Sequence, residues 1–163
     1  MIRLQLSLYV AEPEASGLDA LRARLDPVQH ALIAPHVTLA RDADIDTRSG
    51  PDWRERIAAL REPVLRLHFG PAEAFHEHGI VLRCVGGVDR FDALRARILG
   101  PAALSLAPHI TLAHPRNPKS PGNSLAHALA QLPAPLELRF NAINLIEQCN
   151  GGSWRVLAGA RLL

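Results

Sequence analysis

The sequence is poor in several kinds of residue, and each shortage excludes a class of protein. Aromatic residues make up only 4% of the 163 residues, which is too few for a surface on which successive bases stack. Lysine and arginine (18) barely outnumber aspartate and glutamate (16), so there is no basic tail for nucleic acid. No apolar run approaches the roughly 20 residues that cross a membrane. The chain also lacks a P-loop, a dinucleotide-binding glycine motif, a zinc knuckle and a nucleophile elbow.

Cysteine is equally scarce. Cys84 and Cys149 are the only two, and they lie far apart in no recognisable pattern, so we expect free, buried thiols rather than a disulfide. Residues 3–8 alternate between polar and apolar side chains, as a strand does and a signal peptide does not. These features predict a cytoplasmic protein with no membrane association, and we expect it to be a monomer.

The composition that remains is that of a globular protein. Hydrophobic residues make up 48% of the chain and charged residues 21%, as in a folded domain. The length suits one compact domain, and no linker of the kind that separates independent domains interrupts the sequence. We therefore expect residues 1–163 to form a single domain.

Hydrophobic periodicity predicts the order of helices and strands. Leucines three and four residues apart predict a helix over 14–25 that ends before Pro27. Pro51 suits the start of a second helix, and Gly100 suits the end of a third that carries Phe91. A fourth helix is predicted at 125–132. Alternation predicts strands at 3–10, 36–40, 64–69, 72–76, 79–85, 108–113, 136–146 and 154–162.

This order of elements is a loose internal repeat. A strand, a helix, a strand and a helix are followed by a group of strands, and a similar series then begins again. Strands joined by short turns favour antiparallel sheets with helices packed outside them. The predicted fold class is therefore α+β.

A short phrase occurs once in each half of the repeat. The sequence reads PHVTLA around His36 and PHITLA around His109, and the two phrases hold two of the only three threonines. Because strand residues two apart share a face, His36 lies beside Thr38 and His109 lies beside Thr111. Core packing does not require both polar residues to recur in both copies. The repetition therefore predicts that all four are catalytic residues around one small cavity.

The chemistry of this set of residues suits a phosphoester. An imidazole changes charge near neutral pH, so one histidine can take a proton while the other gives one. The threonine hydroxyls can donate hydrogen bonds to the non-bridging phosphate oxygens, where negative charge lies in the transition state. The residues alone do not say which histidine is the base and which is the acid.

The paired His-x-Thr motifs, each followed by an apolar residue, resemble those of the 2H phosphoesterase superfamily. The chain is most similar to its 2′-5′ RNA ligase-like branch, which includes cyclic nucleotide phosphodiesterases. The chain length, motif spacing and order of elements fit this resemblance throughout. It implies two pseudo-symmetric lobes of antiparallel sheet around a water-filled cleft. It also implies hydrolysis of a 2′,3′-cyclic phosphate or a 2′-5′ linkage, in a nucleotide or at an RNA terminus, without a metal or other cofactor.

Two other activities remain open at this point. Run in reverse, the same two histidines would join a 2′,3′-cyclic phosphate to a 5′-hydroxyl, which is 2′-5′ RNA ligation. A protein that kept the cleft without the chemistry would be a nucleotide- or RNA-binding module, since one fold can host several functions.

Four further residues are candidates for substrate binding. Arg116 follows the second motif, where a strand meets a loop, and an arginine there can hold a phosphate with two hydrogen bonds. Arg41 has the matching place after the first motif, although strict alternation turns it away from His36. Phe75 and Tyr9 are candidates for stacking on a base, against the plainer interpretation that both belong to the core.

Histidines outside the motifs are weaker candidates. His76 and His78 have the spacing of neighbours on one face of a strand, but two histidines alone do not make up a usual set of metal ligands. His114 follows the second motif and is expected at the surface. We therefore expect no metal.

Overall fold

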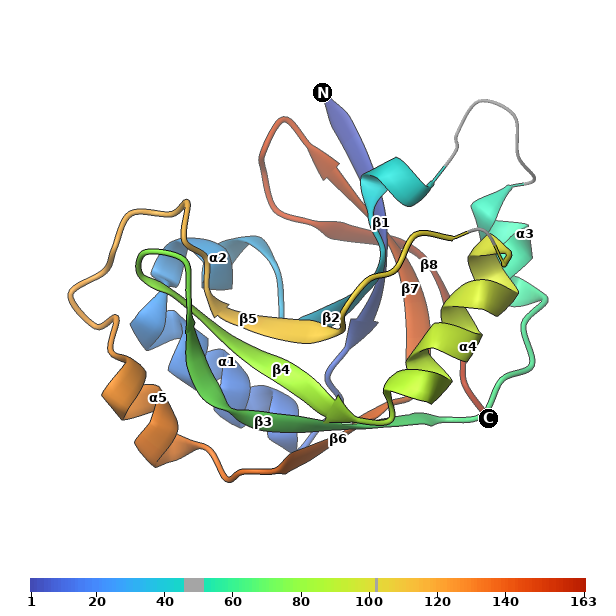
Figure 1. The fold of residues 1–163 in the computed structure, drawn as a ribbon. Helices are drawn as coiled ribbons and strands as arrows, with labels where there is room; N and C mark the ends of the chain where they lie inside the picture. The colour runs from blue at the N-terminus through green and yellow to red at the C-terminus, as the bar shows by residue number, and fades with distance from the viewer. Residues whose placement is uncertain (46–51, 102) are drawn as a thin grey trace.

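The computed structural model describes residues 1–45, 52–101 and 103–163. Within these residues, strands and helices alternate along most of the chain, and the helices lie outside the sheets (Figure 1). The elements are β1 (Ile2–Tyr9), α1 (Glu14–Leu25), α2 (Pro27–Leu32), β2 (His36–Ala40), the 3-10 helix η1 (Asp42–Asp44), α3 (Trp53–Ala58), β3 (Leu65–Phe75), β4 (Gly79–Gly86), α4 (Val88–Leu99), β5 (His109–Ala113), α5 (Leu125–Gln131), β6 (Leu136–Phe140), β7 (Ala142–Cys149) and β8 (Arg155–Arg161).

The strands form two four-stranded antiparallel sheets. Sheet A has the order β2-β1-β7-β8, and sheet B has the order β5-β4-β3-β6. The α+β class with two antiparallel lobes, predicted from the sequence, is confirmed. In each sheet the strand with the His-x-Thr motif is at an edge, and the two edge strands contact each other. The two motifs are therefore brought together where the sheets meet (Figure 1).

One hydrophobic core connects the two sheets with the helices. In both motif strands the residues that alternate with histidine and threonine are fully buried, namely Val37 and Leu39 in β2 and Ile110 and Leu112 in β5. Burial of each such side chain contributes about 2 kcal/mol. Because alternate residues point to opposite faces, this burial also fixes which way the histidines and threonines point.

The helices cross between the two halves of the chain. Helix α1 comes before β2 in the sequence but packs against β5, and α4 comes before β5 but packs against β2. Each motif strand is therefore supported by the helix that belongs to the other half. The position of one motif relative to the other depends on both helices.

Two of the predicted strand boundaries are wrong. The strands expected at 64–69 and 72–76 are one strand, β3, whose pairing with β4 shifts register between Phe69 and Ala72. Pro71 lies in this shift and has no N–H for the sheet, so the strand continues through an irregularity. The single strand expected at 136–146 is divided into β6 in sheet B and β7 in sheet A.

The helix predictions also need correction. The helix expected over 14–25 is α1, with the expected bounds, but α2 was not expected after it. The Asp26 side chain accepts a hydrogen bond from the Gln29 N–H at 2.9 Å and caps α2, with Pro27 as its first residue. Pro51, the expected start of the next helix, lies outside the described residues. Helix α3 is capped by the Asp52 side chain, which accepts from the N–H of Arg54.

The cysteines and the first strand differ from expectation in their burial. Both thiols are free, but Cys84 is only half-buried and Cys149 is exposed. In β1 the residues Gln5 and Ser7 take the polar positions of an alternating pattern that is typical of a strand with one exposed face, yet both are buried. No helix in the described part of the chain is long and apolar enough to cross a membrane.

Candidate active site

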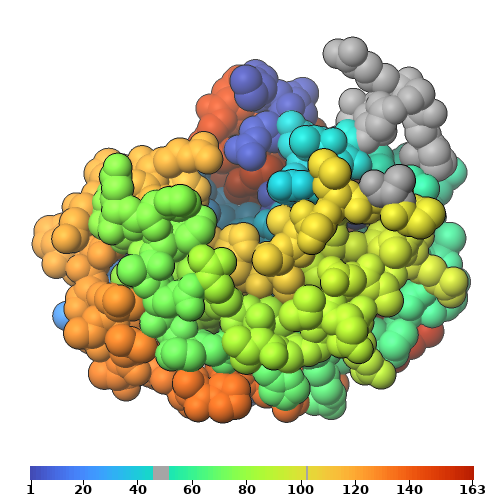
Figure 2. Space-filling model, viewed as in Figure 1, coloured from blue at the N-terminus to red at the C-terminus, as the bar shows by residue number. Residues whose placement is uncertain are grey.

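The four residues of the repeated motifs lie on the facing edge strands. His36 and Thr38 belong to β2, His109 and Thr111 belong to β5, and all four are half-buried. Each motif pair shares the face of its strand that points away from the buried leucines. In the space-filling view the surface is hollowed between the two sheets, and parts of sheet A are visible at the bottom of the hollow (Figure 2).

Both motif histidines are held in the same way. The Nδ1 atom of His36 lies 2.9 Å from the carbonyl oxygen of Ala34, and that of His109 lies 3.0 Å from the carbonyl oxygen of Ala107. A carbonyl only accepts, so Nδ1 carries the proton in both rings. Neither Nε2 atom has a hydrogen-bond partner among the described residues. Each Nε2 atom can therefore take a proton when the ring is neutral and give one when it is charged.

The electrostatic surroundings of His36 favour its neutral form. Burial, which is the largest effect, and the positive charges of Arg22 and His109 together lower the pKa of His36 from 6.5 to about 4. The hydrogen bond to the carbonyl of Ala34 acts in the opposite direction and is outweighed. His36 is therefore neutral at pH 7, with Nε2 as a proton acceptor.

The hydroxyl of Thr38 has a fixed hydrogen-bond donor. The side-chain amide of Gln5 donates to Thr38 Oγ1 at 3.1 Å and to Ser7 Oγ at 2.7 Å. Because Thr38 accepts from Gln5, its own hydroxyl hydrogen is available for a phosphate oxygen. Sequence reasoning missed Gln5 as a site residue, although its alternation with Leu4 and Leu6 had placed it on the same face of β1 as Ser7.

Each motif histidine has an aromatic neighbour, and the two neighbours are the residues that the sequence offered as candidates for stacking on a base. Tyr9 is opposite His36 in the β1–β2 pairing, and the two ring centroids are 6.2 Å apart with the rings edge to face. Phe75 ends β3 with its ring centroid 6.4 Å from that of His109. Both aromatic side chains are half-buried rather than in the core.

The structure places Arg83, which the sequence did not predict as a site residue, beside the second motif. Arg83 is opposite His109 in the β4–β5 pairing, its guanidinium lies 5.6 Å from the Phe75 ring centroid, and it forms an ion pair with Glu73. Nothing in the sequence signals this placement, because strand pairing brings together residues that are 26 positions apart.

The two candidate arginines after the motifs have different surroundings. Arg41 is turned to Asp44, with Nε 3.2 Å from the carboxylate oxygen, as its alternation away from His36 predicts. Arg116 is exposed and lines a hollow of about 760 Å³, together with Phe75, His76, Glu77, His114 and Pro115. Because Phe75 is also next to His109, this hollow begins beside the second motif.

A buried carboxylate holds the loop that carries Arg116. Asp26 is 2% exposed, and its Oδ2 atom accepts from the His114 N–H at 2.8 Å and from the Asn117 side-chain amide at 2.9 Å. The same side chain caps α2, so it joins the first half of the chain to the end of β5. The only signal for it in the sequence was an aspartate followed by a proline, which is a helix-start pattern.

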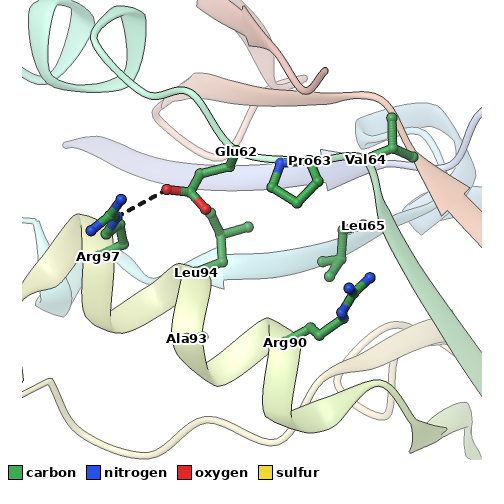
Figure 3. A pocket seen from close by; sticks show the side chains of 8 residues that line it. All are labelled: Glu62, Pro63, Val64, Leu65, Arg90, Ala93, Leu94 and Arg97. Atoms are coloured by element: carbon green, nitrogen blue, oxygen red, sulfur yellow. Dashed lines mark hydrogen bonds and ion pairs between the residues drawn. The ribbon is translucent and has the colours of Figure 1, made fainter.

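Other candidates lie outside this arrangement. His78 interacts with the carbonyl oxygen of Asn117 at 2.7 Å, and no group of three His, Cys, Asp or Glu residues suited to a metal gathers within 1–45, 52–101 and 103–163. A hollow of about 390 Å³ between α4 and residues 62–65 has an ion pair between Glu62 and Arg97 at 3.0 Å (Figure 3). It contains no residue of either motif.

The comparisons with known proteins place the chain in a family. The model of the 2′-5′ RNA ligase superfamily matches residues 10–152, and the chain belongs to this superfamily of 2H phosphoesterases and ligases. Among curated protein sequences, none matches significantly.

Several solved structures share the fold. One is E. coli LigT complexed with 3′-AMP, with 16% identity and a TM-score of 0.60, over 98% of this chain and 97% of that one. TT0787 of Thermus thermophilus has 17% identity and a TM-score of 0.56, over the same shares of both chains. A structure described as a phosphoesterase has 15% identity and a TM-score of 0.59, again over 98% and 97%. At these identities the likeness establishes the fold alone.

Proposed function

We propose that this protein is a phosphodiesterase that hydrolyses 2′,3′-cyclic phosphates or 2′-5′ linkages in nucleotides or at RNA termini, with His36 and His109 as its acid–base pair. The observation that carries the proposal is the matched orientation of the two imidazoles. Each has Nδ1 bonded to the main chain and an Nε2 that no described residue binds, and the two motif strands contact each other. Two such nitrogen atoms serve an in-line displacement, in which one proton is taken and another is given.

The proposed reaction balances with water as the only co-substrate. One neutral imidazole takes a proton from water as the water oxygen forms a bond to phosphorus. The bond between phosphorus and a ribose oxygen breaks, and the other imidazole, in its charged form, gives that oxygen its proton. The hydroxyls of Thr38 and Thr111 donate to the non-bridging oxygens as negative charge develops there.

Substrate binding is proposed for the residues around the pair. Tyr9 and Phe75 lie one on each side of the motif strands, where a base or ribose can pack on either ring. Arg116 can hold a second phosphate group of the substrate, either in a nucleotide or in an RNA chain that continues beyond the scissile phosphate. A nucleotide-sized substrate agrees with LigT structures that are described as complexes with 3′-AMP and with ATP. Arg41 is a weaker candidate because Asp44 already binds its guanidinium.

The test is hydrolysis of the four nucleoside 2′,3′-cyclic phosphates in the presence of EDTA, by wild type, His36→Ala and His109→Ala. We expect wild-type turnover in EDTA and a loss of about a hundredfold or more in each variant, as for removal of a general acid or base. His127→Ala, which changes a histidine of α5, is the matched control and should keep wild-type activity. An unchanged rate in either motif variant would overturn the proposal.

A further inference from the structure

Two arginines are buried among the residues that the structure describes, and neither belongs to a motif. Arg22 of α1 is fully buried and Arg95 of α4 is 3% exposed. Burial of a charged guanidinium costs several kcal/mol unless its hydrogen bonds and charge are compensated. The burial of each arginine must therefore be compensated, and the contacts of its guanidinium show how.

Both arginines donate hydrogen bonds to the main chain of a motif strand in the opposite half. Arg22 Nε donates to the carbonyl oxygen of Thr111 in β5 at 3.2 Å, and Arg95 donates to the carbonyl oxygen of Leu39 in β2 and to that of Leu104 at 2.7 Å. Carbonyls on the outer side of an edge strand have no strand partner, so buried donors are required there. The two contacts cross between the halves and fix each motif strand against the other half's helix.

The sequence repeats this pair as it repeats the motifs. Residues 19–24 and 92–97 both read DALRAR, and the same offset of 73 residues separates Arg22 from Arg95 and His36 from His109. Only the first arginine of each copy is buried. The second, Arg24 or Arg97, lies on the exposed face of its helix, as helical periodicity requires. The repeat therefore extends the His-x-Thr motif to an arginine 14 residues before each histidine.

The elements packed around His36 bring groups of different charge to it. From α1 and β5, Arg22 and His109 both act against a positive charge on His36. The uncharged Tyr9 faces it from β1, and Arg95, which comes from α4, is directed to Leu39 and lies 4.0 Å from Asp44. Arg22 itself is 3.5 Å from Asp19 and is also affected by the charge of Asp26. Among the residues that the structure describes, the charges that act on His36 are those of Arg22 and His109, and both are positive.

We propose that Arg22 is a positioning residue that acts on both motifs: its guanidinium holds β5 at Thr111, and its buried charge adds to the burial that opposes a positive charge on His36, with His36 as the base and His109 as the acid. Arg95 holds β2 in the same way, and its guanidinium lies 4.0 Å from the carboxylate of Asp44. This inference rests on the proposed function for the roles of the histidines. It goes beyond that function by assigning those roles and by naming a residue outside the motifs that contributes to them.

The decisive test is an NMR titration of the histidine rings in the free protein, which needs no substrate. The His36 signals are identified as those missing from His36→Asn. Arg22→Gln removes the charge but keeps a donor, Arg22→Lys keeps the charge, and Arg95→Gln is the matched control. Circular dichroism checks that each variant is folded, and Arg22→Met is the second charge-removing variant if glutamine is not tolerated.

We expect Arg22→Gln to raise the titration midpoint of His36, which should still lie below 6.5 because burial remains. Arg22→Lys and Arg95→Gln should leave that midpoint at the wild-type value. Both glutamine variants should lower kcat/KM by about tenfold or more, as the strands lose a fixed position, but only Arg22→Gln should move the acid limb of its pH profile upward.

Two outcomes would overturn the inference. One is a His36 midpoint that does not change in the folded, charge-removing variants of Arg22. The other is an equal shift in Arg95→Gln, which would mean that loosening of the fold moves the midpoint. If the wild type hydrolyses neither the 2′,3′-cyclic phosphates nor a 2′-5′ linkage, the proposed function fails, while the titration still decides whether the charge of Arg22 acts on His36.

Discussion

The imidazole orientation is set locally, by residues that precede each histidine in the sequence. Both motifs read Ala-Pro-His, and the alanine carbonyl accepts from the histidine Nδ1 in each. A residue before proline is restricted to extended conformations, so the alanine carbonyl has little freedom to turn away. A tripeptide therefore fixes both the ring direction and the tautomer, and its recurrence explains why the two sites match.

The low pKa of His36 predicts the pH dependence of the reaction. If His36 is the base, its protonated form is inactive, so kcat/KM should fall as the pH drops through the pKa of His36. Because that pKa is lowered from 6.5 to about 4, we expect full activity at pH 6 and an acid limb at lower pH. A pH profile of kcat/KM on a nucleoside 2′,3′-cyclic phosphate, taken where circular dichroism shows the protein folded, measures this. An acid limb at or above pH 6.5 would contradict it.

The roles of the two histidines can be separated by the leaving group. A 2′-deoxynucleoside 3′-(p-nitrophenyl phosphate) releases a phenolate that needs no proton, so the acid becomes dispensable while the base does not. His109→Ala should recover most of the hundredfold or greater loss that it shows on a cyclic phosphate, and His36→Ala should not. Equal losses in the two variants on this substrate would mean that the assignment is wrong.

At the scale of elements, the Asp26 side chain connects helix α2 to the loop after β5 through its hydrogen bonds. Asp26→Asn offers one carbonyl oxygen where the carboxylate serves Gln29, His114 and Asn117. At least one buried donor is then unsatisfied, and we expect a loss of about 1–3 kcal/mol in the free energy of unfolding. Urea denaturation measures that loss. Asp89→Asn in α4, at an exposed carboxylate, is the control and should cost less.

The hydrogen bonds of Asp26 to this loop should also affect substrate binding. Asp26 positions the loop of Arg116, so Asp26→Asn should raise KM for an RNA terminus with a phosphate beyond the scissile one more than it lowers kcat. Arg116→Ala should have the same effect without the loss of stability. An unchanged KM in both variants would remove Arg116 from the binding site.

Elements with local signals were predictable, and those that depend on distant partners were not. The bounds of β2 and α1 follow from alternation, leucine spacing and flanking prolines, and the structure has them where the sequence predicts. The division between β6 and β7 had a signal that was overlooked: the buried residues change phase from Leu138 and Phe140 to Ile143 and Leu145. The pairing that puts Arg83 beside His109 has no local signal, because it is a property of the assembled sheet.

At the scale of the whole molecule, the two halves are interlocked rather than joined end to end. Helix α1 supports β5, α4 supports β2, and sheet A is completed by β7 and β8 from the end of the chain. Neither sheet keeps its support if the other half unfolds. This arrangement explains how a site that needs two motifs at a fixed separation is built from two edge strands.

Interlocking predicts that the protein unfolds as one cooperative unit, in keeping with the single domain expected from the sequence. Both tryptophans report on the sheet A side, since Trp53 lies in α3, which packs against β7 and β8, and Trp154 precedes β8. Ile110→Ala changes a fully buried residue in sheet B and should cost about 3 kcal/mol. In urea, tryptophan fluorescence and far-ultraviolet circular dichroism should shift by the same amount. A fluorescence midpoint that stays at the wild-type value would mean that the lobes unfold independently.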